Sequence, residues 1–138
     1  MQKTSAGFRE VEHAADWALH VWAPNLPELL EQAAKGMLAL AGVQIFEDAQ
    51  PCERLLEFTF LDREQLIVRF LNELLYSLEQ EHLAFPETQI SLTDDRLQAV
   101  VRGYPVRSIE KAIKAVTYHN LEVRQTEQGY EAYLVFDV

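Results

Sequence analysis

Cysteine is almost absent from this chain: Cys52 is the single example among 138 residues. One cysteine cannot form an internal disulfide or a cysteine-rich zinc cluster, and this usage suits the reducing cytosol. Apolar runs are short as well, and none approaches the roughly 20 residues that a membrane-spanning helix needs. The N-terminal segment has no apolar run behind its positive charge, so no signal peptide is expected. We therefore expect a soluble cytoplasmic protein with no membrane partner.

Basic side chains are also scarce, with 12 Lys and Arg against 22 Asp and Glu, for a net charge of -10. Direct nucleic-acid binding normally requires a long basic stripe, which this sequence does not contain. An acidic protein more plausibly meets a basic protein surface or a cation. The charge balance therefore favours a protein or metal partner over direct contact with a nucleic acid.

The standard catalytic motifs are missing too. None of the five glycines lies in a phosphate-binding pattern. No serine is flanked by glycines, and no two histidines stand at helical ligand spacing. The sequence gives poor support to a self-contained hydrolase, kinase or zinc enzyme.

The length predicts one domain, residues 1–138, with a single substantial core. Helical spacing of apolar residues predicts a first helix from Leu26 to Leu38, capped by Asn25 and ended by Gly42. A capping box at Asp62 opens a second helix. A short third helix is expected after Ser108, carrying Ile109, Ala112, Ile113 and Val116.

Apolar and alternating segments predict strands, including a hairpin about Asp94-Asp95 and a last hairpin about Glu127-Gln128-Gly129. Breaks are expected at Pro86 and at Gly103-Tyr104-Pro105. The expected strands are Trp17–Ala23, Leu55–Phe60, Thr88–Thr93, Leu97–Arg102, Leu121–Arg124 and Tyr130–Val138. The order of elements indicates an α+β fold, with two main helices and one short helix packed on a mostly antiparallel sheet.

Two aspartates near opposite ends of the chain lie in apolar, strand-like surroundings, where an ionised carboxylate is unfavourable unless it is paired or bound to metal. They are Asp16 and Asp137, and the carboxylate of Val138 follows directly. If the first and last strands are neighbours, these groups offer hard oxygen ligands to one divalent cation. The alternative is that each aspartate marks a strand end and faces solvent.

The segment from Lys114 to His119 gathers a cation, two hydroxyls and an imidazole. These groups suit contact with a partner or a phosphate; alternatively, the segment ends a helix whose dipole favours the two basic residues. His13 and His20 are candidate ligands or acid–base groups, but nothing near them completes a triad. Asn72, in the second helix, lines a partner groove or belongs to a solvated polar stripe.

Four segments resemble the archease family, and the likeness runs over nearly the whole chain. They are Glu12-His13-Ala14-Ala15-Asp16, Leu71-Asn72-Glu73-Leu74-Leu75, Lys114-Ala115-Val116-Thr117-Tyr118-His119 and Phe136-Asp137-Val138. The resemblance implies a small α+β protein in which one strand-helix-strand-strand unit is inserted into another. It also implies a protein that is not an enzyme in its own right.

The resemblance further implies an activator of an RtcB-type RNA ligase in tRNA splicing and RNA repair. Such a protein promotes GTP-dependent guanylylation of the ligase and its repeated turnover. The family's metal site maps onto Asp16, Asp137 and Val138, for Ca²⁺ or for Mg²⁺ or Mn²⁺. The expected contacts with the partner are His13, Lys114, Thr117, Tyr118 and His119.

The sequence departs from the family pattern in two places. Ala14 stands where Thr or Ser is frequent, and Tyr104 follows Gly103 where an acidic residue is common, before a shortened connection to Lys114. Two other functions remain open. One is a metal-independent chaperone or adaptor for an RNA-processing enzyme, and the other is a small metal-dependent enzyme that uses the carboxylates with His13 or His119.

Overall fold

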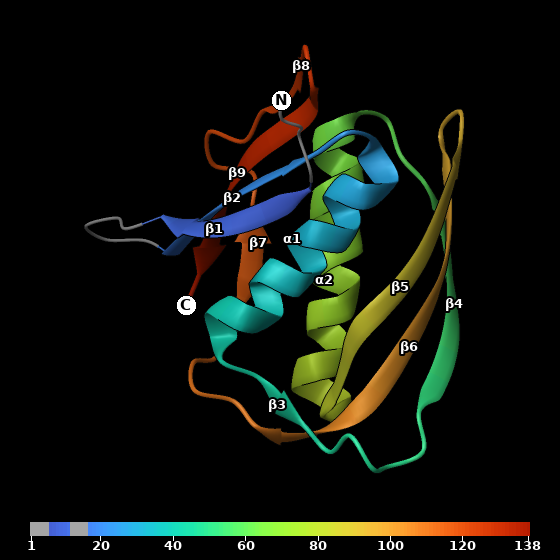
Figure 1. The fold of residues 1–138 in the computed structure, drawn as a ribbon, viewed down its shortest axis with the longest axis vertical. Helices are drawn as coiled ribbons and strands as arrows, with labels where there is room; N and C mark the ends of the chain where they lie inside the picture. The colour runs from blue at the N-terminus through green and yellow to red at the C-terminus, as the bar shows by residue number, and fades with distance from the viewer. Residues whose placement is uncertain (1–5, 12–16) are drawn as a thin grey trace.

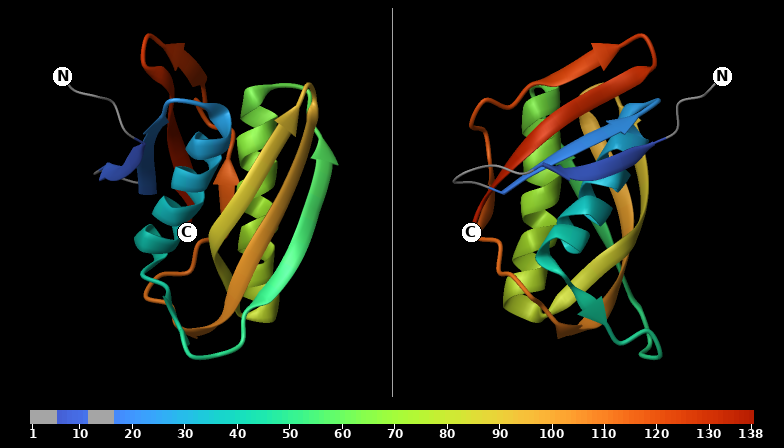
Figure 2. Two further views of the ribbon diagram at one scale, coloured as in Figure 1. Left: turned by 45° about the vertical axis from the view of Figure 1, so that its right-hand side comes forward. Right: turned by 60° about the vertical axis from the view of Figure 1, so that its left-hand side comes forward.

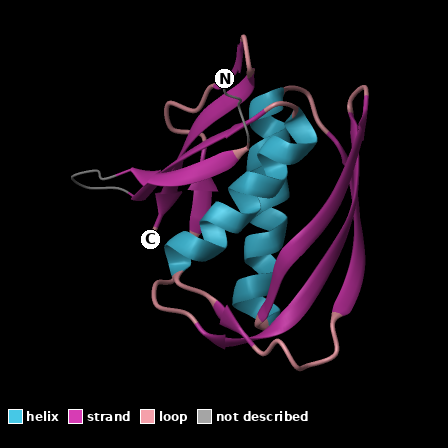
Figure 3. Cartoon of the chain, viewed as in Figure 1, coloured by secondary structure: helices cyan, strands magenta, loops and turns pink. Residues whose placement is uncertain are grey.

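Two antiparallel sheets enclose two helices in the computed structural model, which describes residues 6–11 and 17–138 (Figures 1 and 3). Figure 2 shows the helices between the sheets from two further sides. The helices are α1 (Leu26–Ala41) and α2 (Arg63–Glu81), and the strands are β1 (Gly7–Val11), β2 (Trp17–Ala23), β3 (Gln44–Ile45), β4 (Cys52–Thr59), β5 (Leu83–Thr93), β6 (Arg96–Ser108), β7 (Ala115–Thr117), β8 (Val123–Thr126) and β9 (Gly129–Asp137).

The sheets are nested in the chain. The first has the order β1-β2-β9-β7, with β8 also paired to β9, and the second has the order β3-β6-β4, with β5 paired to β6. The whole second sheet and α2 therefore come between α1 and β7 in sequence. This arrangement confirms the expected α+β fold with one strand-helix-strand-strand unit inserted into another, although the strands form two sheets rather than one.

Both main helices begin at the predicted residues, and α1 also ends at the predicted Gly42. The side chain of Asn25 accepts a hydrogen bond from Glu28 N at 2.9 Å, and Gly42 ends α1 in the left-handed region at φ 64°. At α2, Asp62 accepts from Gln65 N at 2.7 Å, and the Gln65 side chain accepts from Leu61 N at 2.7 Å. These bonds satisfy amide groups that a helix start leaves without partners.

The core lies where the helices meet the two sheets. Alternate residues of β2 and β9 point to it, and so do the apolar faces of both helices. The largest side chains that are almost completely buried include Leu19, Leu29, Leu30, Met37, Phe70, Leu71, Leu97, Leu134 and Phe136. No helix in the described part of the chain has both the length and the apolar content that crossing a bilayer demands.

The short third helix was a wrong prediction. Residues 109–114 form no helix, and β7 follows them. The N–H groups of Glu110 and Lys111 both bond to the carbonyl of Ala41 at the end of α1. The N–H of Lys114, which in a helix would bond to the carbonyl of Glu110, bonds instead to the carbonyl of Asp137. A donor that is engaged by a distant acceptor cannot make the local bond of a helix.

Two predicted breaks lie inside long strands. β5 continues through Pro86, where the pairing with β6 shifts register between Ala84 and Glu87. β6 continues through Gly103 and Pro105. Proline is tolerated at a bulge or on an edge strand, because neither position requires its missing N–H. The predicted hairpins about residues 94–95 and 127–129 are both present.

Candidate functional site at the C-terminal corner

The last strand, β9, brings the C-terminal residues against segments from two other parts of the chain. It pairs with β2, where Trp17 lies opposite Phe136, and with β7, where Ala115 lies opposite Asp137. Lys114 N also donates to the carbonyl of Asp137 at 2.7 Å. We call the group formed by Lys114–His119, Asp137 and Val138 the C-terminal corner.

Only two of the three predicted metal ligands, Asp137 and Val138, lie within the residues that the structure describes. Asp137 and Val138 are exposed, with 42% of Val138 accessible. Asp16 and His13 lie outside the described residues. The carboxylate oxygens of Asp137 and Val138 are the hard ligands that Ca²⁺, Mg²⁺ and Mn²⁺ prefer. Within residues 6–11 and 17–138, no three His, Cys, Asp or Glu side chains gather closely enough to hold an ion. The donor chemistry therefore fits a divalent cation, and a complete site requires a further ligand such as Asp16.

β7 and the residues on either side of it present polar side chains near the end of β9. Lys114 and His119 are exposed, Thr117 is half-buried, and 56% of Tyr118 is accessible. A turn fixes the segment, because Thr117 Oγ1 accepts from His119 N at 3.3 Å and Leu121 N donates to the carbonyl of Tyr118 at 3.0 Å. The side chains of this segment are therefore available to a partner.

Asn72 holds the corner to α2. Its Oδ1 accepts from Val116 N at 3.0 Å, and its Nδ2 donates to the carbonyl of Val116 at 3.4 Å. Val116 lies on β7, whose outward main-chain groups meet no further strand among the described residues. The side-chain amide supplies one acceptor and one donor, as a neighbouring strand would. Asn72 thus positions β7, a contact that neither sequence-based alternative for this residue included.

A second side chain from α2 acts in the same way at β8. Glu64 Oε2 accepts from Val123 N at 2.7 Å. Glu64 and Asn72 are about 12 Å apart along the helix axis at 1.5 Å per residue. The helix therefore ties down both short strands that flank β9. Sequence reasoning missed both contacts, since a polar residue on a helix carries no local sign of the strand that it will meet.

The two tryptophans of β2 are five residues apart and lie on opposite faces of the strand. Trp17 packs against the core, and Lys111 Nζ lies 3.0 Å from the centre of its ring. On the other face, His20 contacts Trp22, stacks on Tyr133 with ring centres 4.2 Å apart, and bonds to Glu131 at 3.2 Å. This engagement gives His20 a structural role in the sheet.

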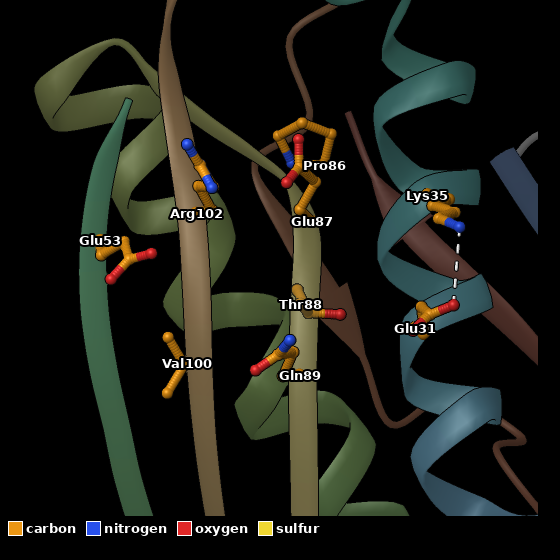
Figure 4. Close-up of a pocket in the computed structure, with 9 residues that line it drawn as sticks. All are labelled: Glu31, Lys35, Glu53, Pro86, Glu87, Thr88, Gln89, Val100 and Arg102. Atoms are coloured by element: carbon orange, nitrogen blue, oxygen red, sulfur yellow. Dashed lines mark ion pairs between the residues drawn. The ribbon is translucent and has the colours of Figure 1, made fainter. Parts of the chain in front are cut away.

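A groove of about 350 Å³ lies away from the C-terminal corner, between α1 and the second sheet (Figure 4). Carboxylates and cations both line it, and its Lys35 and Glu31 form an ion pair at 3.5 Å. None of the predicted site residues lines this groove. Its mixed charges give no convergent set of acid, base and nucleophile for the small metal-dependent enzyme considered above.

Two solved structures share this architecture. One is the crystal structure of an archease from Thermotoga maritima, described as a possible chaperone. The two chains are 24% identical, and their alignment covers 100% of this chain and 98% of the Thermotoga maritima chain, with a TM-score of 0.69. The other is the solution structure of a Methanobacterium thermoautotrophicum protein, 25% identical over 96% of this chain and 99% of its own, with a TM-score of 0.68. The fold thus defines a class of small, nested α+β proteins.

Sequence similarity identifies the family within that class. Residues 8–138 match the archease protein family. Protein archease of Archaeoglobus fulgidus is 31% identical over 95% of this chain and 98% of its own length. Protein archease of Danio rerio is 28% identical over 95% of this chain and 85% of its own length. The chain therefore belongs to the archease family, as its four sequence segments predict.

Proposed function

We propose that this chain activates an RtcB-type RNA ligase by presenting the C-terminal corner to the ligase. Membership of the archease family supports the proposal. The single observation that carries it is the pairing of β7 with β9, because this pairing sets Lys114 and Ala115, at the start of the Lys114–His119 segment, beside Asp137. The corner thereby combines exposed anionic and cationic groups within one short stretch of surface.

The proposed metal site consists of Asp16, Asp137 and the carboxylate of Val138. Trp17 pairs with Phe136 across β2 and β9. Asp16 precedes the first of these paired residues, and Asp137 follows the second. A divalent cation supplies positive charge that orients phosphate groups.

The protein's own groups would then act through orientation. Asp137 and Val138 hold the cation at the end of β9, while Lys114 and His119 meet the partner beside it. The net charge of -10 draws the chain toward a basic RNA-binding cleft and away from RNA itself. Correct placement of GTP against the ligase's histidine is the step that this orientation accelerates.

Single-turnover guanylylation of the ligase with GTP tests this proposal. We expect the wild-type chain to stimulate the step, and Asp137→Ala to stimulate it far less. Asp48→Ala is the matched control, because Asp48 is an exposed loop residue outside the corner. Equal stimulation by the wild type and Asp137→Ala would contradict the proposal.

A second candidate function is a metal-independent chaperone or adaptor for an RNA-processing enzyme. The Thermotoga maritima archease, described as a possible chaperone, favours it. In that case Asp137→Ala and Asp48→Ala would support the client equally. Comparing guanylylation with each of these two variants at one fixed metal concentration separates the two candidates.

A further inference from the structure

The strand β4 leaves one edge of the second sheet open. Within the described residues it pairs only with β6, over all eight of its residues, and it forms the outer border of the sheet (Figures 1 and 2). The main-chain groups of such an edge can pair with a further strand. Recognition by strand addition takes its affinity from these groups and its selectivity from pockets for alternate side chains.

Three alternate residues of β4, Phe58, Leu56 and Arg54, lie on the side of the strand that faces α2. We call their positions the first, middle and third levels. At the first level, the guanidinium of Arg69 lies 4.6 Å from the ring centre of Phe58. At the third, Arg54 lies 5.6 Å from the ring centre of Phe85 and bonds to both carboxylate oxygens of Glu81, at 2.5 and 2.8 Å. Each of these outer levels is therefore occupied by an arginine.

The middle level holds no arginine. There Leu56, Glu73 and Tyr76 line a groove of about 280 Å³ between β4 and α2, which extends to Arg54 and Glu81, the ion pair of the third level. Glu73 is exposed, and 65% of Tyr76 is accessible. Among the described residues, no cation lies within ion-pair distance of Glu73. The middle level thus offers a carboxylate and an aromatic ring over an apolar floor.

We propose that β4 binds an extended segment of another protein, which adds a strand to the sheet and places an arginine in this middle groove. The arginine's stem would lie on Leu56, and its guanidinium would meet the carboxylate of Glu73 and the ring of Tyr76. Both contacts are those that arginine makes best. Apolar residues that alternate with the arginine would cover Leu55, which is 60% accessible and pairs with Val100 on the outer face.

Charge and register favour such a basic partner over a second copy of this chain. A two-fold axis through Leu55 would set Glu53 opposite Glu57 of the second copy. An axis through Leu56 would instead set Leu55 opposite Glu57. Like charges directly opposite each other weaken strand pairing, and a leucine opposite a carboxylate adds nothing. The net charge of -10 also attracts a basic segment and repels another acidic chain.

A synthetic peptide that alternates valine and arginine, matched to the eight residues of β4, tests the proposal. Amide chemical shifts and hydrogen exchange of the full chain follow its binding. We expect β4 amides to shift and to exchange more slowly. Glu73→Gln and Tyr76→Ala should each weaken binding about fivefold, as the loss of one exposed contact does. Glu79→Gln, an exposed carboxylate on the same helix, is the matched control and should not weaken it.

Four results would overturn the proposal: no binding, equal binding of a peptide alternating valine and glutamate, equal weakening by Glu79→Gln, or shifts confined to other strands. Dimerisation with protection of β4 in the absence of peptide would make a second copy the occupant, and this too would refute the proposal. The β4 edge is separate from the C-terminal corner. Failure of this test would therefore leave the proposed activation of the ligase unaffected.

Discussion

Replacing Asn72 with alanine should detach β7 from α2. Val116 is 3% accessible, and its N–H bonds to Asn72 Oδ1 at 3.0 Å. A buried donor left without a partner is unfavourable by about 1–3 kcal/mol. Alanine forms helix better than asparagine by roughly 0.5 kcal/mol, which offsets part of the loss. We therefore expect a net destabilisation of about 1–2 kcal/mol, a sizeable share of the roughly 5–15 kcal/mol that stabilises a typical protein.

Urea unfolding measures the free energy, and amide hydrogen exchange at Val116 shows where the loss arises. Gln80→Ala is the control, because Gln80 is an exposed amide on the same helix. Asn72→Ala should accelerate exchange at Val116 more than in the core strand β2, since the lost bond is local. If Val116 exchanges at the wild-type rate, or if both variants are equally stable, the assigned role of Asn72 is wrong.

Three further predictions concern packing, pH and metal. Gly103→Ala should destabilise the chain by about 1–3 kcal/mol in urea, because its Cβ would lie 2.5 Å from the ring of buried Phe85; wild-type stability would refute this. The bonds from Arg54 hold the pKa of Glu81 below its ordinary value of 4.5. The ion pair therefore stabilises the fold above about pH 4.5, and this stabilisation disappears as the pH falls through the lowered pKa. The difference in unfolding free energy between wild type and Glu81→Gln should therefore shrink on acidification, and a constant difference would count against the pair. Isothermal titration with Ca²⁺ or Mn²⁺ should show binding that Asp137→Ala abolishes; unchanged binding would refute the role of Asp137 as a ligand.

Local signals in the sequence predicted most of the elements. Asn25 and Asp62 form the expected caps, and period-two alternation about Asp94-Asp95 marks a real hairpin. These features depend on residues a few positions apart, so the sequence contains their cause. The nested order of units came from resemblance to a family rather than from periodicity.

Long-range contacts explain what local patterns could not predict. Ser108 and the apolar residues after it have helical spacing, but the N–H of Lys114 bonds to the carbonyl of Asp137 in place of a helical acceptor. Gly103 has the composition of a break, yet it lies within β6 because Phe85 packs where its side chain would be. In each case a residue remote in sequence determines the conformation.

At the candidate site, the residues of the C-terminal corner could be predicted from the sequence, but the side chains that hold the neighbouring strands in place could not. Sequence reasoning selected Asp137 and the Lys114–His119 segment, which β7 and β9 bring side by side. It did not predict that Asn72 and Glu64 would hold the flanking strands. A helix pattern shows which face is polar, but it does not show what that face meets.

The pairing of Trp17 with Phe136 joins residues roughly 120 positions apart. Closing so long a loop is entropically unfavourable, and contacts of this kind slow folding. Because β9 follows every other described element in sequence, it docks beside β2 only after both helices and the second sheet have been synthesised. A partner that binds the C-terminal corner will therefore distinguish a chain in which β2 and β9 have paired from one in which they have not.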